Sequence, residues 1–145
     1  FCDYSPQLTR NFRALKLWMS LKVFGAKAFA DAVQHGFDLA RYTEQKIRSL
    51  ESWSIITQAQ MGILTFRYEP ESYSEKEINK LNQMIVEALI EDGTAMLSST
   101  KLRDTVVLRI CPINPRTTES DINLTLSRLD KLTEKVQKNF TKKAT

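Results

Sequence analysis

The 145-residue chain is poor in the residues that mark cross-linked or unstructured proteins: it has two cysteines, four glycines, four prolines and one histidine. Cys2 and Cys111 lie far apart and outside any CxxC pair, so we expect no disulfide framework and a reducing, cytoplasmic setting. The single histidine, His35, offers no metal-ligand spacing, and we expect no metal site. The shortage of glycine and proline argues against a low-complexity linker.

Long apolar runs and strong charge are also missing. No run approaches about eighteen apolar residues, so a membrane partner is not expected. The net charge of +4 is mild, and its one basic concentration, Lys138, Lys142 and Lys143, is typical of a solvated terminus rather than of a nucleic-acid site. The 42% of hydrophobic residues suffice for one core. Because the chain starts at Phe1, without methionine or a signal-like segment, we expect a piece of a longer polypeptide.

Hydrophobic periodicity and turn residues predict four helices and four strands. The predicted helices cover residues 8–24, 26–50, 74–92 and 118–140, and the predicted strands cover 53–57, 61–68, 95–100 and 105–111. Their order, two helices, two strands, a helix, two strands and a helix, predicts an α+β two-layer sandwich whose mostly antiparallel sheet has helices on one face. Residues 1–50 form a helical segment leading into an α/β domain at 51–145.

Four local signals refine these elements. Gly25 predicts a left-handed end to the first helix, and Ser74 with Glu77 predicts a capping box. Gly36 within the second helix indicates either close packing or a kink. The first helix carries a wide apolar face at Phe12, Leu15, Trp18 and Met19, which we expect to be exposed and to make the isolated chain associate.

Arg109 is the most informative residue, because it interrupts an otherwise apolar strand. Val106, Leu108 and Ile110 point to one face of that strand, and Arg109 points to the other. In a half-buried sheet an unpaired guanidinium costs several kcal/mol, so Arg109 is expected to need an anion from its own fold, a partner or a ligand. A structural ion pair, or an arginine reaching solvent along its stem, stays an alternative.

No complete active site is visible in the sequence. It has no nucleophile elbow, no glycine-rich phosphate loop and no metal cluster, so taken alone the chain is more typical of a binding or accessory domain than of an enzyme.

Five short motifs, however, occur in a characteristic order. They are NFRALKLW at 11–18, GILTFR at 62–67, LRD at 102–104, VVLR at 106–109 and NPRTTESDI at 114–122. In order and spacing they resemble the C-terminal part of the pyridoxal-phosphate-dependent amino-acid decarboxylases of the aromatic-amino-acid and glutamate decarboxylase group. The resemblance covers essentially the whole chain, about a third of a typical member.

This resemblance implies the small domain of an aspartate-aminotransferase-like fold, in an enzyme that works as a dimer on an amino-acid substrate. The cofactor, pyridoxal 5'-phosphate, is then held covalently by a lysine of a large-domain polypeptide outside this chain. In the family that lysine follows a histidine, whereas His35 precedes Gly36, so no catalytic residue is assigned here.

The resemblance also suggests roles for three arginines. Arg109 matches an arginine linked to the substrate carboxylate, and Arg13 and Arg116 match positions near the cofactor or between domains. The implied function is to close the active site of a decarboxylase, and the chain alone is expected to be inactive. The alternative is a non-catalytic interaction or dimerisation module that kept the fold.

Overall fold

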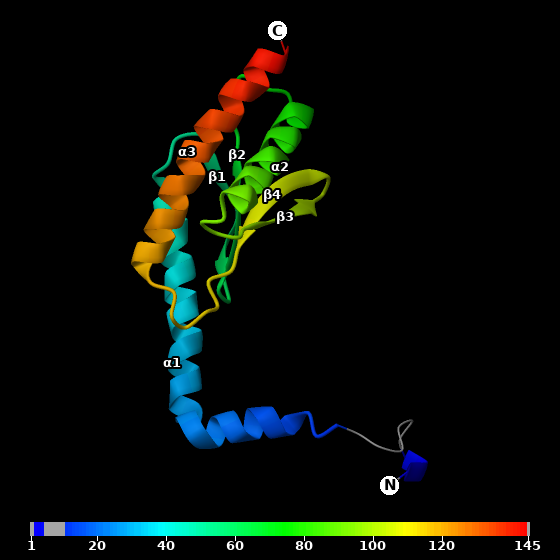
Figure 1. Ribbon diagram of the computed structural model, residues 1–145, viewed down its shortest axis with the longest axis vertical. Helices are drawn as coiled ribbons and strands as arrows, with labels where there is room; N and C mark the ends of the chain where they lie inside the picture. Colours follow the sequence, from blue (N-terminus) through cyan, green and yellow to red (C-terminus); the bar gives the residue numbers. More distant parts are fainter. Residues whose placement is uncertain (1, 5–10, 145) are drawn as a thin grey trace. The chain divides into compact units, whose positions relative to one another are not determined.

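The structure is a computed structural model that describes residues 2–4 and 11–144. The chain divides into two compact units, residues 1–32 and 33–145. The elements are η1 (Cys2–Tyr4), α1 (Ala14–Arg48), β1 (Trp53–Gln60), β2 (Ile63–Tyr68), α2 (Glu75–Asp92), β3 (Ser98–Leu102), β4 (Thr105–Ile110) and α3 (Glu119–Ala144), labelled in Figure 1. This order confirms the predicted succession of helices and strands. The predicted domain boundary at residue 51 stays a prediction.

The first unit contains the first part of α1. The helix is interrupted at Gly25, whose φ of 80° and ψ of 155° are not helical, at the position where the sequence predicted a helix end. The predicted residues 8–10 of this helix lie outside the described residues. The expected apolar face is exposed: Leu15 is 37% exposed and Phe12 is 69% exposed, with Trp18 and Met19 between these values.

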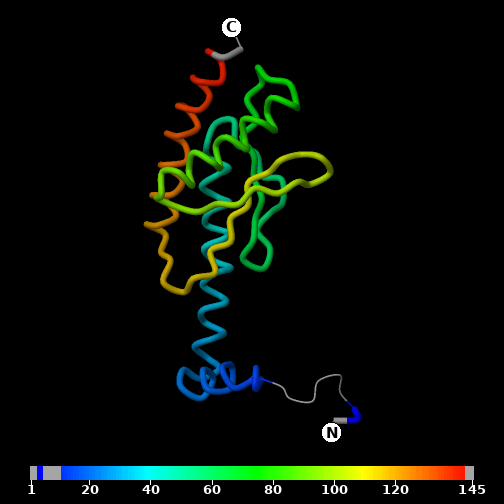
Figure 2. Tube along the Cα trace, turned by 45° about the vertical axis from the view of Figure 1, so that its right-hand side comes forward, coloured from blue at the N-terminus to red at the C-terminus, as the bar shows by residue number. Residues whose placement is uncertain are grey.

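The second unit is built on a four-stranded antiparallel sheet with the order β1-β2-β4-β3, made of two hairpins (Figure 2). Alternate residues of β2 and β4 face the helices. The core cluster joins their side chains to residues from α1, α2 and α3. Its most enclosed members are Ala40, Ile47, Leu64, Phe66, Leu81, Ile85, Leu89, Leu108 and Leu129. The predicted α+β sandwich with helices on one face of the sheet is therefore confirmed.

The other side of the sheet, here called the polar face, carries hydroxyl and arginine side chains. Strand pairing places Thr57 beside Thr65, Thr65 beside Arg109, and Arg109 beside Ser98. It also pairs Ser54 with Arg67, and Thr100 with Val107. The polar face is defined by seven polar residues, Ser54, Thr57, Thr65, Arg67, Ser98, Thr100 and Arg109, together with the buried Val107, and none of these eight belongs to the core cluster.

Two asparagines of α2 close one end of the sheet. The pairing of β2 with β4 ends at Phe66 and Leu108, which leaves the next backbone groups without a strand partner. The buried Asn82 side chain accepts a hydrogen bond from the Tyr68 N–H (2.9 Å) and donates to the Tyr68 carbonyl (2.8 Å). Asn79 accepts from the Val106 N–H (2.6 Å) and donates to the Asp104 carbonyl (3.2 Å). The backbone groups exposed by the parting strands are thus satisfied.

Both predicted helix starts in this unit are capped as expected. Glu77 accepts hydrogen bonds from the N–H and the hydroxyl of Ser74, and these bonds lower the pKa of the Glu77 carboxyl. At the start of α3, Asp121 accepts from the Thr118 N–H and donates its own N–H to the Thr118 hydroxyl. Gly93, with a φ of 72°, ends α2 in the left-handed conformation.

The hairpin between β3 and β4 differs from the prediction. The sequence placed its turn at residues 101–104, but Lys101 and Leu102 pair with β4 and only Arg103 and Asp104 form the turn, with φ of 48° and 69°. Tight hairpin turns with two left-handed residues favour Asn-Gly, so this one lacks its usual sequence signal. Likewise β1 continues to Gln60 rather than ending at residue 57, up to the turn at Met61 and Gly62.

Gly36 is a site of close packing rather than of a kink. A Cβ atom on Gly36 would lie 3.1 Å from the carbonyl oxygen of Pro112, which is closer than most real contacts of this kind. Next to it, His35 Nε2 donates to the Thr117 carbonyl at 2.7 Å. Together these contacts fix the segment that leaves β4 against α1.

Replacing Gly36 by alanine should therefore destabilise the protein. Alanine gains about 1 kcal/mol of helix propensity, but pushing Pro112 away costs about 1 to 3 kcal/mol of overpacking. We expect a net loss of up to about 2 kcal/mol in urea unfolding. The matched control is Gln34→Ala, at an exposed position of the same helix, which should change stability by less than about 0.5 kcal/mol. A Gly36→Ala protein that is more stable than the parent by about 1 kcal/mol, the full gain of helix propensity, would contradict the close packing.

Asn82→Leu should be more costly. Leucine has the same branched shape as asparagine but leaves the Tyr68 N–H and carbonyl buried without partners, at about 1 to 3 kcal/mol each. The free energy of unfolding should fall by about 2 to 6 kcal/mol in urea denaturation. The exposed Gln83→Leu on the same helix serves as the control and should be nearly neutral. Equal stability of the two variants would show that the asparagine does not satisfy these groups.

Candidate functional site

Arg109 lies in β4 on the polar face, as its alternation predicted. Its side chain is exposed, and Nε donates a hydrogen bond to Ser98 Oγ at 3.2 Å. No carboxylate in residues 2–4 and 11–144 forms an ion pair with it. Of the possibilities that the sequence left open, the structure therefore shows an arginine that reaches solvent, because the alternation of a strand gives the side of a residue but not its cover. A solvated guanidinium carries no burial penalty.

The buried arginine of this sheet is Arg67 in β2. It is 2% exposed, and its Nη atoms contact Glu69 at 3.1 Å, Glu75 at 2.8 Å and the Asn79 side-chain oxygen at 2.9 Å. In the sequence, Arg67 was noted only as part of the GILTFR motif. Its burial and pairing could have been inferred from its alternation with Leu64, Phe66 and Tyr68, together with the two glutamates, Glu69 and Glu75, that pair with it.

The two arginines of the polar face therefore differ in charge balance. Two carboxylates from the same fold neutralise Arg67, whereas Ser98 is the partner of Arg109 among the residues that the structure describes. Within that part of the chain only Nε of Arg109 is engaged, so its two Nη groups stay available to a ligand. A guanidinium presented in this way is suited to a planar carboxylate, which it binds through two parallel hydrogen bonds.

The other two arginines singled out in the sequence, Arg13 and Arg116, belong to other segments of the chain. Arg13 precedes α1 in the first unit, where it is exposed and its backbone N–H donates to the Asn11 carbonyl at 2.8 Å. Arg116 is exposed in the segment between β4 and α3, where its backbone N–H donates to the Asn114 side chain at 3.0 Å. Within the described residues no hydrogen bond or ion pair joins Arg116 to Arg109, so the roles of Arg13 and Arg116 stay predictions.

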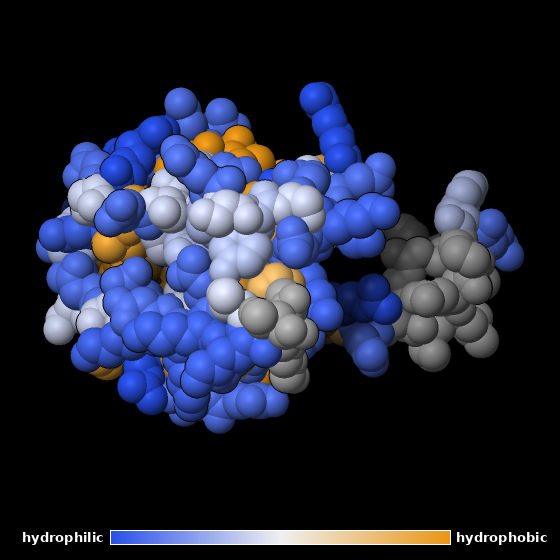
Figure 3. Space-filling model, turned by 90° about the horizontal axis from the view of Figure 1, so that it is seen from above, coloured by the Kyte–Doolittle hydropathy of each residue, from blue (hydrophilic) through white to orange (hydrophobic). Residues whose placement is uncertain are grey.

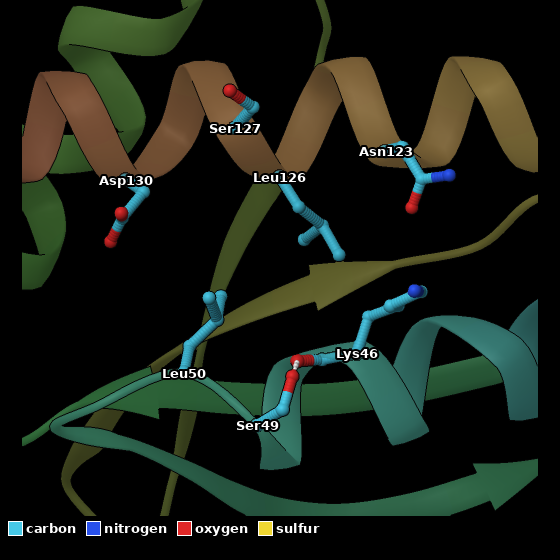
Figure 4. A pocket seen from close by; sticks show the side chains of 7 residues that line it. All are labelled: Lys46, Ser49, Leu50, Asn123, Leu126, Ser127 and Asp130. Carbon is cyan, nitrogen blue, oxygen red and sulfur yellow. Dashed lines mark hydrogen bonds between the residues drawn. The ribbon is translucent and has the colours of Figure 1, made fainter.

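Two neighbouring grooves lie on the helical side of the second unit, between the end of α1 and α3. One has a volume of about 310 Å³; in Figure 4, Leu50 and Leu126 point toward each other across it, with Lys46 at one end and Asp130 at the other. The second, of about 380 Å³, shares Leu50 and Asp130 and reaches Tyr68. Burial is the main cause that raises the pKa of the Tyr68 phenol, and nearby groups that include Asp130 raise it further. None of the predicted site residues lines either groove.

The face of the molecule in Figure 3 is mainly hydrophilic, with small, separate hydrophobic areas. In the described part of the chain, no three histidine, cysteine, aspartate or glutamate side chains are grouped as metal ligands would be. No helix there is both long enough and apolar enough to cross a bilayer. The polar face with Arg109 is thus the candidate site.

Comparison with known proteins shows which family the chain resembles. The pyridoxal-dependent decarboxylase conserved domain matches residues 1–69. An aromatic-L-amino-acid decarboxylase from Bacillus atrophaeus is 43% identical over 97% of this chain, which covers 29% of that relative. An L-2,4-diaminobutyrate decarboxylase from Acinetobacter baumannii is 30% identical over 86% of the chain, which covers 24% of it. The chain therefore spans less than a third of the length of these relatives.

The fold agrees with these sequence matches. The solved glutamate decarboxylase domain of a diaminobutyrate-pyruvate transaminase and L-2,4-diaminobutyrate decarboxylase from Vibrio parahaemolyticus superposes with a TM-score of 0.77. The superposition covers 88% of this chain and 27% of that one, at 24% sequence identity. A structural match at 24% identity supports the fold alone, whereas the sequence matches support a relationship between the proteins. Together they show that the chain resembles, along nearly its whole length, a part of the pyridoxal-dependent decarboxylases.

Proposed function

We propose that the chain is the C-terminal part of a pyridoxal-phosphate-dependent L-amino-acid decarboxylase. It closes an active site that it shares with a cofactor-bearing region outside this chain. The observation that carries this proposal is the 43% identity to an aromatic-L-amino-acid decarboxylase along nearly the whole chain. The polar face supports it, because Arg109 presents an unneutralised guanidinium there.

The described residues do not themselves fit the cofactor. A lysine that holds an aldehyde cofactor works in an enclosed, desolvated pocket, and each lysine whose exposure is described lies on the surface. We therefore assign the cofactor lysine to the region outside this chain. When bound, pyridoxal 5'-phosphate supplies an electron sink for the carbon that loses carbon dioxide.

The contribution of this chain is positioning. Arg109 binds the substrate carboxylate through its Nη groups and orients the substrate. The sheet behind it closes one side of the cleft and excludes water from the reacting groups. Arg13 and Arg116 lie near the boundary with the cofactor-bearing region, as the family resemblance suggests.

The exposed apolar side chains of the first unit support the proposal that this chain binds a large partner. Phe12, Trp18 and Met19 are each more than half exposed, which is unusual for a helix of a complete soluble domain. We infer that they pack against the cofactor-bearing polypeptide, and that the assembled enzyme is a cytoplasmic dimer. In the alternative, a non-catalytic interaction module, the same side chains bind a partner without a cofactor. Purified assembled protein that shows no absorption band of bound pyridoxal phosphate would favour this alternative.

The decisive variant is Arg109→Lys in the enzyme assembled with its cofactor-bearing region. Lysine keeps the charge but loses the planar fork, so kcat/KM should fall about tenfold to a thousandfold, equivalent to about 1.4 to 4 kcal/mol of transition-state stabilisation. Cofactor content should stay near normal, because the cofactor is held elsewhere. Steady-state kinetics and the absorbance of bound cofactor measure the two effects.

The matched control is Arg103→Lys, at an exposed position in the turn between β3 and β4, which should leave kcat/KM unchanged. A purely structural Arg109 gives a different pattern: a lower melting temperature and lost cofactor, with normal kinetics in the protein that stays folded. A folded and fully active Arg109→Lys enzyme would exclude the substrate-binding role.

A further inference from the structure

We propose that Ser98 is a positioning residue for Arg109. Its hydroxyl holds Nε of the guanidinium and thereby orients the guanidinium toward the substrate carboxylate. This inference rests on the proposed function and deepens it, because it assigns a task to a residue that belongs to none of the five motifs shared with the decarboxylase group. Ser98 opens β3, the strand at the edge of the sheet next to β4.

The strand register brings the two residues together. Ser98 and Arg109 are directly opposite each other in the antiparallel pair of β3 and β4, so their side chains leave the sheet on the same side. Ser98 is half-buried, and its hydroxyl accepts from Arg109 Nε at 3.2 Å. The backbone of two paired strands therefore fixes the point at which the guanidinium is held.

Because Ser98 binds Nε of Arg109, it determines which N–H donors remain for a ligand. A guanidinium has five N–H donors in a fixed plane, one on Nε and four on the two Nη atoms. With Nε occupied by Ser98, the fork formed by Nη1 and Nη2 is the edge that remains for a ligand. That fork matches the two oxygens of a planar carboxylate. The site is thus shaped for end-on recognition of a carboxylate.

Ser98 acts through Arg109 rather than on its own. The Arg109 contact is the one side-chain hydrogen bond of Ser98 among the described residues. The next residue, Ser99, points to the helical side of the sheet, where its hydroxyl donates to Gln83 at 3.1 Å. Without Ser98 the long Arg109 side chain, otherwise solvated, adopts several orientations. Ordering it then costs conformational entropy when the substrate binds.

The experiment uses the assembled enzyme and a matched pair of ligands. From a panel of aromatic, acidic and diamino L-amino acids, the one with the highest kcat/KM is taken together with the amine it yields on decarboxylation. The two ligands differ only in the carboxylate. For Ser98→Ala we expect kcat/KM for the amino acid to fall about three- to tenfold. This is the loss expected when one hydrogen bond to a charged group is removed at a partly exposed position. Competitive inhibition by the amine should be unchanged.

Two further variants separate positioning from a general structural effect. Ser98→Thr keeps the hydroxyl in a strand position and should restore most of the activity. Ser99→Ala, at the next residue of the same strand, whose hydroxyl donates to Gln83 on the helical side of the sheet, should leave both ligands unaffected. A Ser98→Ala enzyme that binds the amino acid and the amine equally weakly would overturn the proposal, since the hydroxyl would then not act on the carboxylate.

A double-mutant cycle tests the route through Arg109. Lysine has no Nε donor for Ser98 to hold, so adding Ser98→Ala to Arg109→Lys should have no further effect, whereas additive losses would overturn the positioning role. If the parent enzyme decarboxylates no amino acid, the proposed function itself fails and this inference falls with it. If Arg109→Lys is impaired but Ser98→Ala is fully active, only this inference fails.

Discussion

The arrangement of the second unit depends on how α2 meets the end of the sheet where β2 and β4 stop pairing. Buried backbone groups without partners are costly, and two strands that part would leave several of them. Asn79 and Asn82 supply the missing partners from one helix. This fixes α2 along the sheet and keeps β2 and β4 in register over the pairs that follow, which include Thr65 and Arg109.

The contact between α2 and the end of β2 also explains why Arg67 is paired with carboxylates and Arg109 is not. Asn79 and Glu75 stand on α2 next to the end of β2, so Arg67 meets an acceptor and a carboxylate from that helix, and a second carboxylate from Glu69. A buried ion pair of this kind adds little net stability, but losing one partner is costly, so it constrains the geometry. Arg109 pairs with Thr65, two residues before Arg67 in β2, and among the described residues it forms no ion pair with these carboxylates.

Much of the fold could be predicted from the sequence, because its signals are local. Helical periodicity, the capping pairs Ser74–Glu77 and Thr118–Asp121, and the stop at Gly93 depend on neighbouring residues, and the structure confirms all of them. The turn at Arg103 and Asp104 was misplaced because Asn79, from a distant helix, supports it in place of the usual glycine.

The candidate site could be predicted only in part. Alternation along β4 correctly gave the side on which Arg109 lies, but the burial of an arginine depends on what packs over it. Arg67 is covered through α2 and its carboxylates, which no pattern within β2 reveals. The contact between Ser98 and Arg109 could not be predicted for the same reason: it depends on the register of two strands, and a serine in an edge strand has no distinctive sequence signal.

The central claim is that the polar face of this sheet meets the substrate through Arg109. A crystal structure of the enzyme, containing its cofactor-bearing region and a bound amino-acid analogue that resists decarboxylation, tests it most directly. The account predicts the carboxylate of the analogue within about 2.7–3.2 Å of both Nη atoms of Arg109, with Nε still on Ser98. A carboxylate held by other residues, with Arg109 paired to an aspartate or glutamate of the cofactor-bearing region, would contradict it.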